Sequence, residues 1–422
     1  MPRKKDQYKN ELSTYLASPG RQWCQLFGKL KAGSTNFEWN TNVFGLLLLM
    51  IVLCLPNCAN EEKNAELSIS DKAILAEADK YLQENPVTIT AFTAERSAGG
   101  VNDYFSEGSY WWPDPENPDG PYIRKDGHRN PNNFGAHKKA LKQMVEWVTS
   151  LTAAYQITGD EKYAQQAIRH LTAWFVDPAT LMNPNLLYGQ AIHGISTGRG
   201  IGIIDTLGLI NVSLSIRLLA ASGKLGGENY AVIQQWFSDY GDWLTTHPYG
   251  IEERDNNNNH STWWGAQVAA YALVAQREDL FVISREQFKN QLDLQMAADG
   301  SFPDELGRTK PFHYTSYNLR GWTTFCQLAS TAEENLWTYE SKSGNLKKAL
   351  EFVLPYLETP ASWPYLTPLE TSLHVSRNDY LVFAYWCSGE EKYLDFWHQL
   401  PQGEDDHHAN LVLWQNKILN EE

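Results

Sequence analysis

The chain of 422 residues is poor in cysteine, with only five. Cys24, Cys54 and Cys58 lie near the N-terminus, while Cys326 and Cys387 lie in apolar, aromatic segments. A free cysteine in such surroundings usually behaves as a small hydrophobic residue. One disulfide is the most that Cys326 and Cys387 could form, and we expect no cysteine-based metal site, because such sites need more thiolates.

Positive charge is also scarce. The chain carries 35 Lys and Arg against 50 Asp and Glu, a net charge of −15. Without residues 1–58 the counts become 28 and 47, a net charge of −19. A protein this acidic is repelled by polyanions, so we expect no nucleic-acid partner and no anionic membrane surface. An acidic substrate would need a local basic site.

Long hydrophobic runs are missing except at residues 43–55, which read VFGLLLLMIVLCL. This run is too short for a comfortable membrane span and has the length of a signal-peptide core, although a buried core helix is an alternative. The following Leu55-Pro56-Asn57-Cys58 resembles a bacterial lipoprotein processing site. We therefore expect residues 1–58 to be a leader with a signal peptide. The mature protein would be periplasmic, anchored to the outer membrane through a lipid on Cys58, or secreted by a bacterium.

No long alternating strand pattern and no Pro/Ser-rich linker occur after the leader, whereas helical spacing of apolar residues recurs. Short glycine-bearing turns join several of these segments into hairpins, which must bury their apolar faces on neighbouring hairpins. We predict an all-α fold, an incomplete (α/α) toroid that forms a single large domain over residues 59–422. The expected helices cover residues 71–84, 133–155, 161–175, 214–221, 230–244, 380–386 and 394–400.

The basic and aromatic residues gather in three long irregular stretches, residues 103–132, 183–202 and 299–320. Long structured loops are usually functional. Gly198-Arg199-Gly200 follows no strand and carries no dinucleotide fingerprint, so we expect no nucleotide site. Glu305 is close enough in sequence to pair with Arg308. The candidates for binding a sugar chain are Tyr110, Trp111, Trp112, Gln190, His193, Arg199, Asn258, His313 and Tyr317. Arg308, Lys310 and Tyr314 lie in the third stretch as well.

A run of four asparagines, residues 256–259, precedes His260 and an apolar helical segment. Asparagine is a favoured N-cap because its side-chain oxygen accepts a hydrogen bond from the first turn. This pattern predicts a helix start that fixes His260, with Asn258 and Asn259 beside it. A polar loop with one capping asparagine and a packed histidine is the alternative.

Taken in order, several motifs of these stretches resemble the alginate-lyase-like polysaccharide lyases, over about residues 70–400. The resemblance implies an α/α toroid with an active-site groove at one end. It also implies an enzyme that cleaves polyuronates by β-elimination. The motifs are Tyr110-Trp111-Trp112-Pro113-Asp114-Pro115, residues 122–128, Gln190-Ala191-Ile192, Thr197-Gly198-Arg199-Gly200, Asn258-Asn259-His260 and residues 299–314.

The resemblance also implies residue roles. Asn259 and Arg308 would neutralise the uronate carboxylate, where charge builds up when the C5 proton leaves. His260 and Tyr314 would act as base and acid, or Tyr314 alone would do both where proton and leaving group share a face. The family's segment from arginine to tyrosine is one residue longer and its tyrosine is followed by histidine, so Tyr317 is an alternative to Tyr314. No metal or cofactor is required.

We therefore predict a lyase that acts on alginate rich in β-D-mannuronate and leaves 4,5-unsaturated uronate ends, with glucuronan as the alternative substrate. A glycoside hydrolase would instead need two facing carboxylic acids, for which Asp114, Asp304 and Glu305 are the candidates. A non-catalytic glycan-binding lipoprotein would need only the aromatic residues. We expect an anionic polysaccharide as the partner and a monomeric protein.

Overall fold

A computed structural model describes residues 69–331, 333–403 and 408–420. The predicted leader, with its signal peptide and Cys58, lies outside these residues. Residues Ala73–Glu422 form one unit, to which the following description applies. The helices are α4 (Ile69–Tyr81), α5 (Ala136–Thr158), α6 (Glu161–Phe175), α7 (Leu209–Ala221), α8 (Gly227–Thr246), α9 (Pro248–Arg254), α10 (Asn259–Ala275), α11 (Glu278–Gln295), α12 (Pro303–Leu306), α13 (Pro311–Ala329), α14 (Leu346–Glu358), α15 (Asp379–Ser388), α16 (Glu391–Gln399) and α17 (His408–Asn420).

Two of the predicted helical hairpins, α5–α6 and α15–α16, are confirmed. Between α5 and α6 the chain turns at Gly159, which ends α5 in the left-handed conformation with φ of 70°. Asp160 then begins α6, and its side chain accepts a hydrogen bond from the backbone N of Lys162. Gly389 repeats the glycine stop between α15 and α16 with φ of 69°. Glycine adopts this conformation without the penalty that a Cβ brings, so the turn sequence determines where each helix stops.

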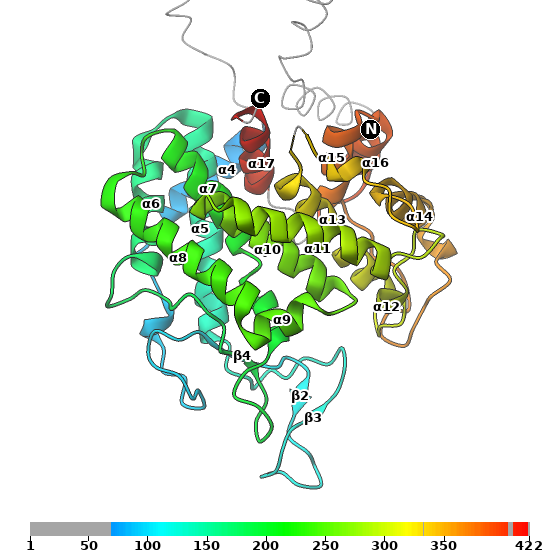
Figure 1. The fold of residues 1–422 in the computed structure, drawn as a ribbon, viewed down its shortest axis with the longest axis horizontal. Helices are drawn as coiled ribbons and strands as arrows, with labels where there is room; N and C mark the ends of the chain where they lie inside the picture. Colours follow the sequence, from blue (N-terminus) through cyan, green and yellow to red (C-terminus); the bar gives the residue numbers. More distant parts are fainter. Residues whose placement is uncertain (1–68, 332, 404–407, 421–422) are drawn as a thin grey trace, which may run out of the picture. The chain divides into compact units, whose positions relative to one another are not determined.

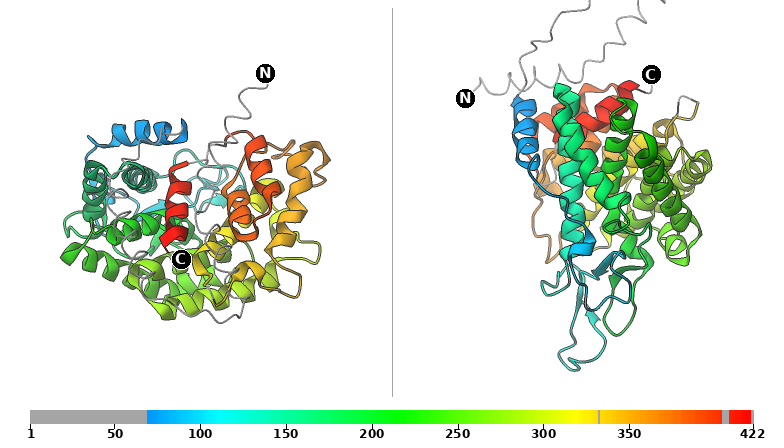
Figure 2. Two further views of the ribbon diagram at one scale, coloured as in Figure 1. Left: turned by 90° about the horizontal axis from the view of Figure 1, so that it is seen from above. Right: turned by 90° about the vertical axis from the view of Figure 1, so that its left-hand side faces the viewer.

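The helices form two layers of an incomplete toroid (Figure 2). Helices α5, α7, α10, α13 and α15 pack side by side in chain order, and α6, α11, α14 and α16 each pack on their hairpin partners. Helix α10 is enclosed by α7, α8, α11 and α13, so nearly all of its side chains are buried, the polar Thr262 and Gln267 among them. Helix α17 packs on α5 and α7, and its Trp414 lies 5.1 Å from Phe383 of α15. The last helix thus contacts both ends of the inner layer.

Four short strands cluster at one end of the unit (Figure 1). Strand β1 (Phe105–Glu107) pairs in parallel with β4 (Tyr188–Ala191), and β2 (Trp111–Trp112) pairs antiparallel with β3 (Ile123–Arg124). The sequence did not predict them, since strands of two to four residues are too short for an alternating pattern. The β1–β4 pair holds the first irregular stretch against the second, and the β2–β3 pair lies within the first. Four 3₁₀ helices complete the described elements: η1 (Ile89–Ala91), η2 (Gly200–Thr206), η3 (Leu336–Thr338) and η4 (Pro360–Ser362).

Close backbone approach in the second stretch requires glycine. A Cβ on Gly202 would lie 2.5 Å from the carbonyl carbon of Gly189.

In the helical layer, Cys326 and Cys387 are both free, so the disulfide that the sequence allowed is not formed. Among the described residues, no helix alone has the length and apolarity to cross a membrane, although the bent pair η2 and α7 meets both criteria together.

Candidate active site

His260 lies in the first turn of α10, as the asparagine run predicts. Asn258 is the N-cap, and its Oδ1 accepts a hydrogen bond from the backbone N of His260 at 3.0 Å. The imidazole Nδ1 lies 2.7 Å from Oε1 of Glu253, whose side chain is 1% exposed. Burial raises the pKa of Glu253, and the neighbouring His260 opposes that rise. The bond occupies Nδ1, so Nε2 is the nitrogen left for a substrate proton.

Asn259 is buried and held by a second glutamate. Its backbone N and its Nδ2 donate to Oε1 of Glu305 at 2.6 and 2.9 Å, and Nδ2 lies 3.0 Å from Oε2. Burial raises the pKa of Glu305, and the hydrogen bonds from Asn259 oppose that rise. The pairing of Glu305 with Arg308 suggested by their spacing is wrong. Because an amide nitrogen carries two hydrogens, this contact leaves Asn259 one for a substrate carboxylate.

Tyr314, in the first turn of α13, meets residues from the first irregular stretch. Its hydroxyl lies 3.1 Å from that of Tyr110, and the Arg308 guanidinium lies 3.8 Å from its ring centroid. Arg308 also pairs with Asp126 at 3.3 Å, and Thr309 donates to the same carboxylate. Burial raises the pKa of Tyr314, the bond to Tyr110 adds to the rise, and Arg308 opposes it. Tyr314 is therefore protonated at neutral pH in the free protein.

Tyr317 lies one turn further along α13, beside Trp263 at 5.3 Å between ring centroids. Its ring is parallel to that of His313, 6.3 Å away. Burial raises the pKa of Tyr317; Arg320 opposes the rise, and the negative charges of Glu253 and Asp205 add to it. The structure thus places both candidate tyrosines on one side of α13, and the charge of Glu253, the partner of His260, is among those that raise the pKa of Tyr317.

Arg199 is fixed by Gln190. Its Nε and one terminal nitrogen each donate to Gln190, to the backbone oxygen and to Oε1, both at 3.0 Å. Gln190 has φ of 49°, an uncommon conformation for a residue other than glycine. Burial lowers the pKa of Arg199 to about 10, so the guanidinium stays charged at neutral pH. It lies 5.8 Å from the ring of Trp111, which brings charge and a flat apolar face together.

Two predicted binding residues lie apart from this cluster. Trp112 is on the β2–β3 hairpin, where Lys125 lies 5.4 Å from its ring. His193 packs on Tyr122 and lines a separate depression of about 340 Å³ beside β1 and β4. Neither touches Tyr314 or His260 through a contact that the structure records.

Sequence reasoning missed the acidic residues behind the site. Glu253 precedes His260 by seven residues on another helix, and Asp126 reaches Arg308 across 182 positions. The side chain of Asp205 is buried, pairs with Lys138 at 2.6 Å and accepts a hydrogen bond from Ser106 at 2.6 Å. No local pattern marks these carboxylates, because each acts on a partner brought close only by folding. Among the described residues no cluster of three or more His, Cys, Asp or Glu could hold a metal ion.

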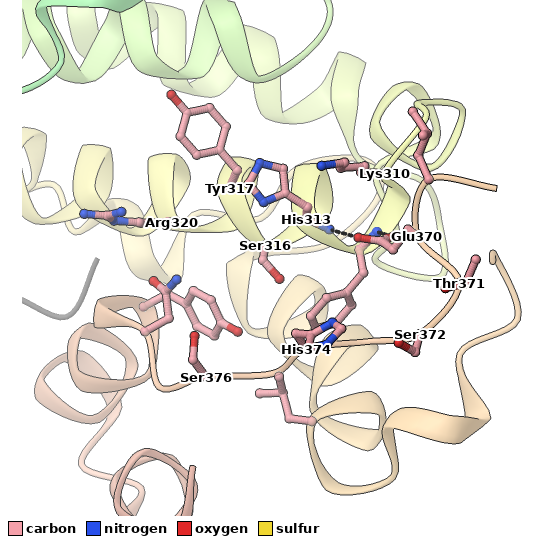
Figure 3. Close-up of a pocket in the computed structure, with 15 residues that line it drawn as sticks. Lys310, His313, Ser316, Tyr317, Arg320, Glu370, Thr371, Ser372, His374 and Ser376 are labelled. Atoms are coloured by element: carbon pink, nitrogen blue, oxygen red, sulfur yellow. Dashed lines mark hydrogen bonds between the residues drawn. The ribbon is translucent and has the colours of Figure 1, made fainter. Parts of the chain in front are cut away.

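A cavity of about 390 Å³ lies next to the tyrosines, between α13 and the segment before α15 (Figure 3). His313 and Tyr317 line it, together with residues that the sequence did not single out. Those facing residues include Glu370, His374 and Ser376.

Two of the three acids that a glycoside hydrolase would use are engaged elsewhere. Glu305 is buried and bound to Asn259, and Asp114 lies in a turn where its Oδ1 accepts a bond from the backbone N of Glu116. The geometry offers histidine, tyrosine and arginine in place of two carboxylic acids.

The sequence model of a family described as alginate lyase matches residues 88–363. An alginate lyase of Pseudomonas syringae pv. tomato is 31% identical over 137 residues, which are 31% of this chain and 34% of that protein. An alginate lyase of Cobetia marina is 31% identical over 134 residues, with the same coverage. The match thus spans about a third of the length of these curated relatives.

Solved structures agree over more of the chain. An alginate lyase from Bacteroides ovatus superposes with a TM-score of 0.71 and 32% identity, over 82% of this chain and 92% of that one. Alginate lyase A1-III from Sphingomonas species A1 shares the fold at 15% identity and a TM-score of 0.50, over 76% of this chain and 89% of that one. The family match covers well over half of the sequence and includes His260 and Tyr314, and the chain belongs to the alginate lyase family.

Proposed function

We propose that this protein is a polysaccharide lyase that cleaves alginate rich in β-D-mannuronate by β-elimination. The observation that carries the proposal is the pairing of two proton-transfer groups with fixed partners: His260 with Glu253, and Tyr314 with Tyr110 and Arg308. The alginate lyases similar to this chain support the substrate.

The reaction needs three functions from the chain. Arg308, with the free amide hydrogen of Asn259, neutralises the uronate carboxylate and stabilises the charge that spreads onto it. A base removes the C5 proton, the electron pair forms the C4–C5 double bond, and the C4–O4 bond breaks. An acid then protonates O4 of the leaving chain. The products are a new reducing end and a 4,5-unsaturated uronate end.

Tyr314 holds its proton at neutral pH, so it carries the proton that O4 of the leaving chain needs. In β-D-mannuronate the C5 proton and O4 lie on one face of the ring, so a single tyrosine serves both steps there and His260 holds the carboxylate. Where the proton and O4 lie on opposite faces, as in guluronate, His260, with Nδ1 bound to Glu253, presents Nε2 as the base. Trp111 beside Arg199 offers a stacking surface with a positive charge for a neighbouring sugar unit.

The test is absorbance near 235 nm, where unsaturated uronates absorb, with residues 59–422 and separate samples of polymannuronate, polyguluronate and glucuronan. We expect a rise with polymannuronate that Tyr314→Phe lowers at least 100-fold, as for the loss of an acid–base group. Tyr317→Phe tests the alternative tyrosine: we expect it to keep most of the activity, and a loss as large as that of Tyr314→Phe would assign the acid to Tyr317 instead. New reducing ends without absorbance would refute elimination in favour of hydrolysis, and binding without either signal would support a glycan-binding protein.

Export and lipidation at Cys58 stay predictions from the sequence. Labelling with a radioactive fatty acid in a bacterial host, compared between the full chain and Cys58→Ser, tests them.

A further inference from the structure

Helix α13, which carries Tyr314, begins without a cap of its own. Its first residue is Pro311, which has no N–H, and the preceding Lys310 makes no side-chain capping bond. The first turn of a helix leaves its backbone N–H groups without partners inside the helix. In α13 these are the N–H groups of Phe312 and His313, because the N of Tyr314 already donates to the backbone oxygen of Lys310 at 3.0 Å. The start of this helix therefore needs an acceptor from elsewhere in the chain.

Glu370 supplies that acceptor from 57 to 58 positions further along the chain. Its Oε2 accepts a hydrogen bond from the backbone N of Phe312 at 2.7 Å, and its Oε1 accepts one from that of His313 at 3.1 Å. Figure 3 shows the carboxylate of Glu370 at the start of α13, bonded to the helix backbone. A carboxylate is favourable there because its hydrogen bonds are charge-assisted and because it complements the helix dipole. One side chain thus satisfies both N–H groups.

A tight turn presents Glu370 to the helix. The backbones of Thr367 and Glu370 bond to each other in both directions at 3.2 and 3.1 Å, and Oγ1 of Thr367 accepts from the backbone N of Glu370 at 3.1 Å. The same Oγ1 donates to the backbone oxygen of Thr309 at 2.6 Å. Residues 367–370, here called the clip, therefore hold the chain on both sides of Pro311, at Thr309 and at the capped N–H groups.

The clip also contacts the first irregular stretch. Leu369 packs so closely on Gly127 that a Cβ at residue 127 would lie 2.7 Å from its Cδ1. Thr309, which the clip holds by its backbone oxygen, donates through Oγ1 to Asp126 at 3.1 Å. Residues 308–314 are thus held from two directions, by Asp126 of the first stretch and by the clip.

We propose that the clip positions Tyr314 and Arg308 for the reaction, with Glu370 as the positioning residue. Tyr314 directly follows the two capped residues and Arg308 directly precedes Thr309, so a shift of the helix start moves both groups relative to the substrate. A displacement of about 1 Å can lower the rate of an enzyme about 100-fold. The clip follows residue 363, where the family match ends, so the match does not account for it. The inference rests on the proposed function and adds to it a residue that acts through the start of α13.

The acceptor at residue 370 tests the clip. Glu370→Ala removes both hydrogen bonds, whereas Glu370→Gln keeps one acceptor oxygen in a side chain of the same shape. Asp160→Ala is the matched control, because it removes the side-chain cap of α6, a helix that carries none of the candidate site residues. Absorbance with polymannuronate gives kcat and KM, and urea unfolding gives the stability of each variant. Hydrogen exchange with mass spectrometry reports on the amides of residues 309–316.

We expect Glu370→Ala to lower kcat about tenfold or more while KM changes less than about threefold, because Tyr314 acts in the transition state rather than in binding. Amides at the start of α13 should exchange at least about tenfold faster, with unchanged exchange in the α5–α6 hairpin. Glu370→Gln should recover kcat to within about threefold of the parent protein, since one acceptor remains. Asp160→Ala should lose stability and keep both kcat and KM.

An unchanged kcat in folded Glu370→Ala would refute the clip, as would equal kcat values for the alanine and glutamine variants. A loss of kcat that Asp160→Ala reproduces would assign the effect to stability and refute it as well. Thr367→Val provides a second variant if Glu370→Ala does not fold, because it removes the hydrogen bond to Thr309 and nearly keeps the shape of the side chain. The same loss of kcat with KM retained is expected there, and an unchanged kcat would refute the proposal.

The two proposals fail separately. If the parent protein yields no unsaturated products from any polymer, the elimination is refuted, and the exchange of α13 amides in Glu370→Ala still shows whether the clip holds the helix. Cleavage of polymannuronate by the parent protein, with kcat unchanged in Glu370→Ala, refutes the clip and retains the lyase.

Discussion

Removing His260 should leave a buried carboxylate without its partner, and the resulting loss of stability should depend on pH. Glu253 is 1% exposed and bonds to His260 at 2.7 Å, and its pKa is raised by burial. In His260→Ala the main group that opposes this rise is gone, so the pKa of Glu253 rises further above its unfolded value. A carboxyl whose pKa is higher in the folded state binds more protons there, and stability falls as pH rises above the unfolded pKa of about 4.3.

The size of the effect follows from the burial. An uncompensated buried charge costs about 3–5 kcal/mol, and the nearby charge of Arg199 reduces that cost. We therefore expect the free energy of unfolding of His260→Ala to fall by about 2–4 kcal/mol between pH 5 and pH 8. For a unit of about 350 residues, the entropy of unfolding is about 0.7 kcal/mol/K. A loss of about 3 kcal/mol therefore lowers Tm by roughly 4 °C.

The assay compares His260→Ala with the double variant His260→Ala/Glu253→Gln by urea unfolding at both pH values. Both lack the imidazole, so their difference isolates the charge of Glu253, and the glutamine keeps an acceptor for Asn256, whose Nδ2 lies 3.2 Å from Oε2. We expect the two variants to differ less near pH 5 than at pH 8, where the single variant is the less stable. Equal stability at both pH values would refute the buried charge as the cause.

Three further predictions concern the active site. Tyr110→Phe removes a hydrogen bond that raises the pKa of Tyr314, so the alkaline limit of kcat should move to lower pH. We expect kcat itself to fall about threefold to tenfold. An unchanged alkaline limit in the pH profile would exclude this coupling. Burial raises the pKa of Asp126, but its bonds and the charges of Arg124 and Arg308 outweigh burial and lower it. Asp126→Asn should therefore reduce stability at pH values above the unfolded pKa of Asp126, and this difference should disappear as pH falls through the folded pKa. The same change should lower kcat/KM about tenfold, because it releases Arg308. Denaturation at pH 3 and pH 7 measures the effect on stability, with Asp114→Asn as the matched control. Incubation with EDTA followed by the absorbance assay should leave activity unchanged, because in the proposed mechanism Arg308 and Asn259 neutralise the carboxylate. A loss of activity that Ca²⁺ or Zn²⁺ restores would contradict this.

Local chemistry in the sequence was enough to predict the helical hairpins and the start of α10. Apolar spacing gives the buried face of each helix, glycine at 159 gives the stop of α5, and Asn258 gives the cap that positions His260. These features depend on residues a few positions apart, so they can be recognised without the fold. The motifs also singled out Tyr314 and Arg308, which the structure brings together with Tyr110.

Only the tertiary structure decided which groups meet. Strand β1 pairs with β4 about 80 positions later, Tyr110 meets Tyr314 across 204 positions, and Glu305 reaches Asn259 across 46. Glu253, Glu305 and Asp126 look like ordinary surface acids in the sequence, because their effect depends on burial and on a distant partner. Helix periodicity is a local property that the sequence carries by itself, whereas the environment of a charged group is set by the packing of segments far apart in the chain.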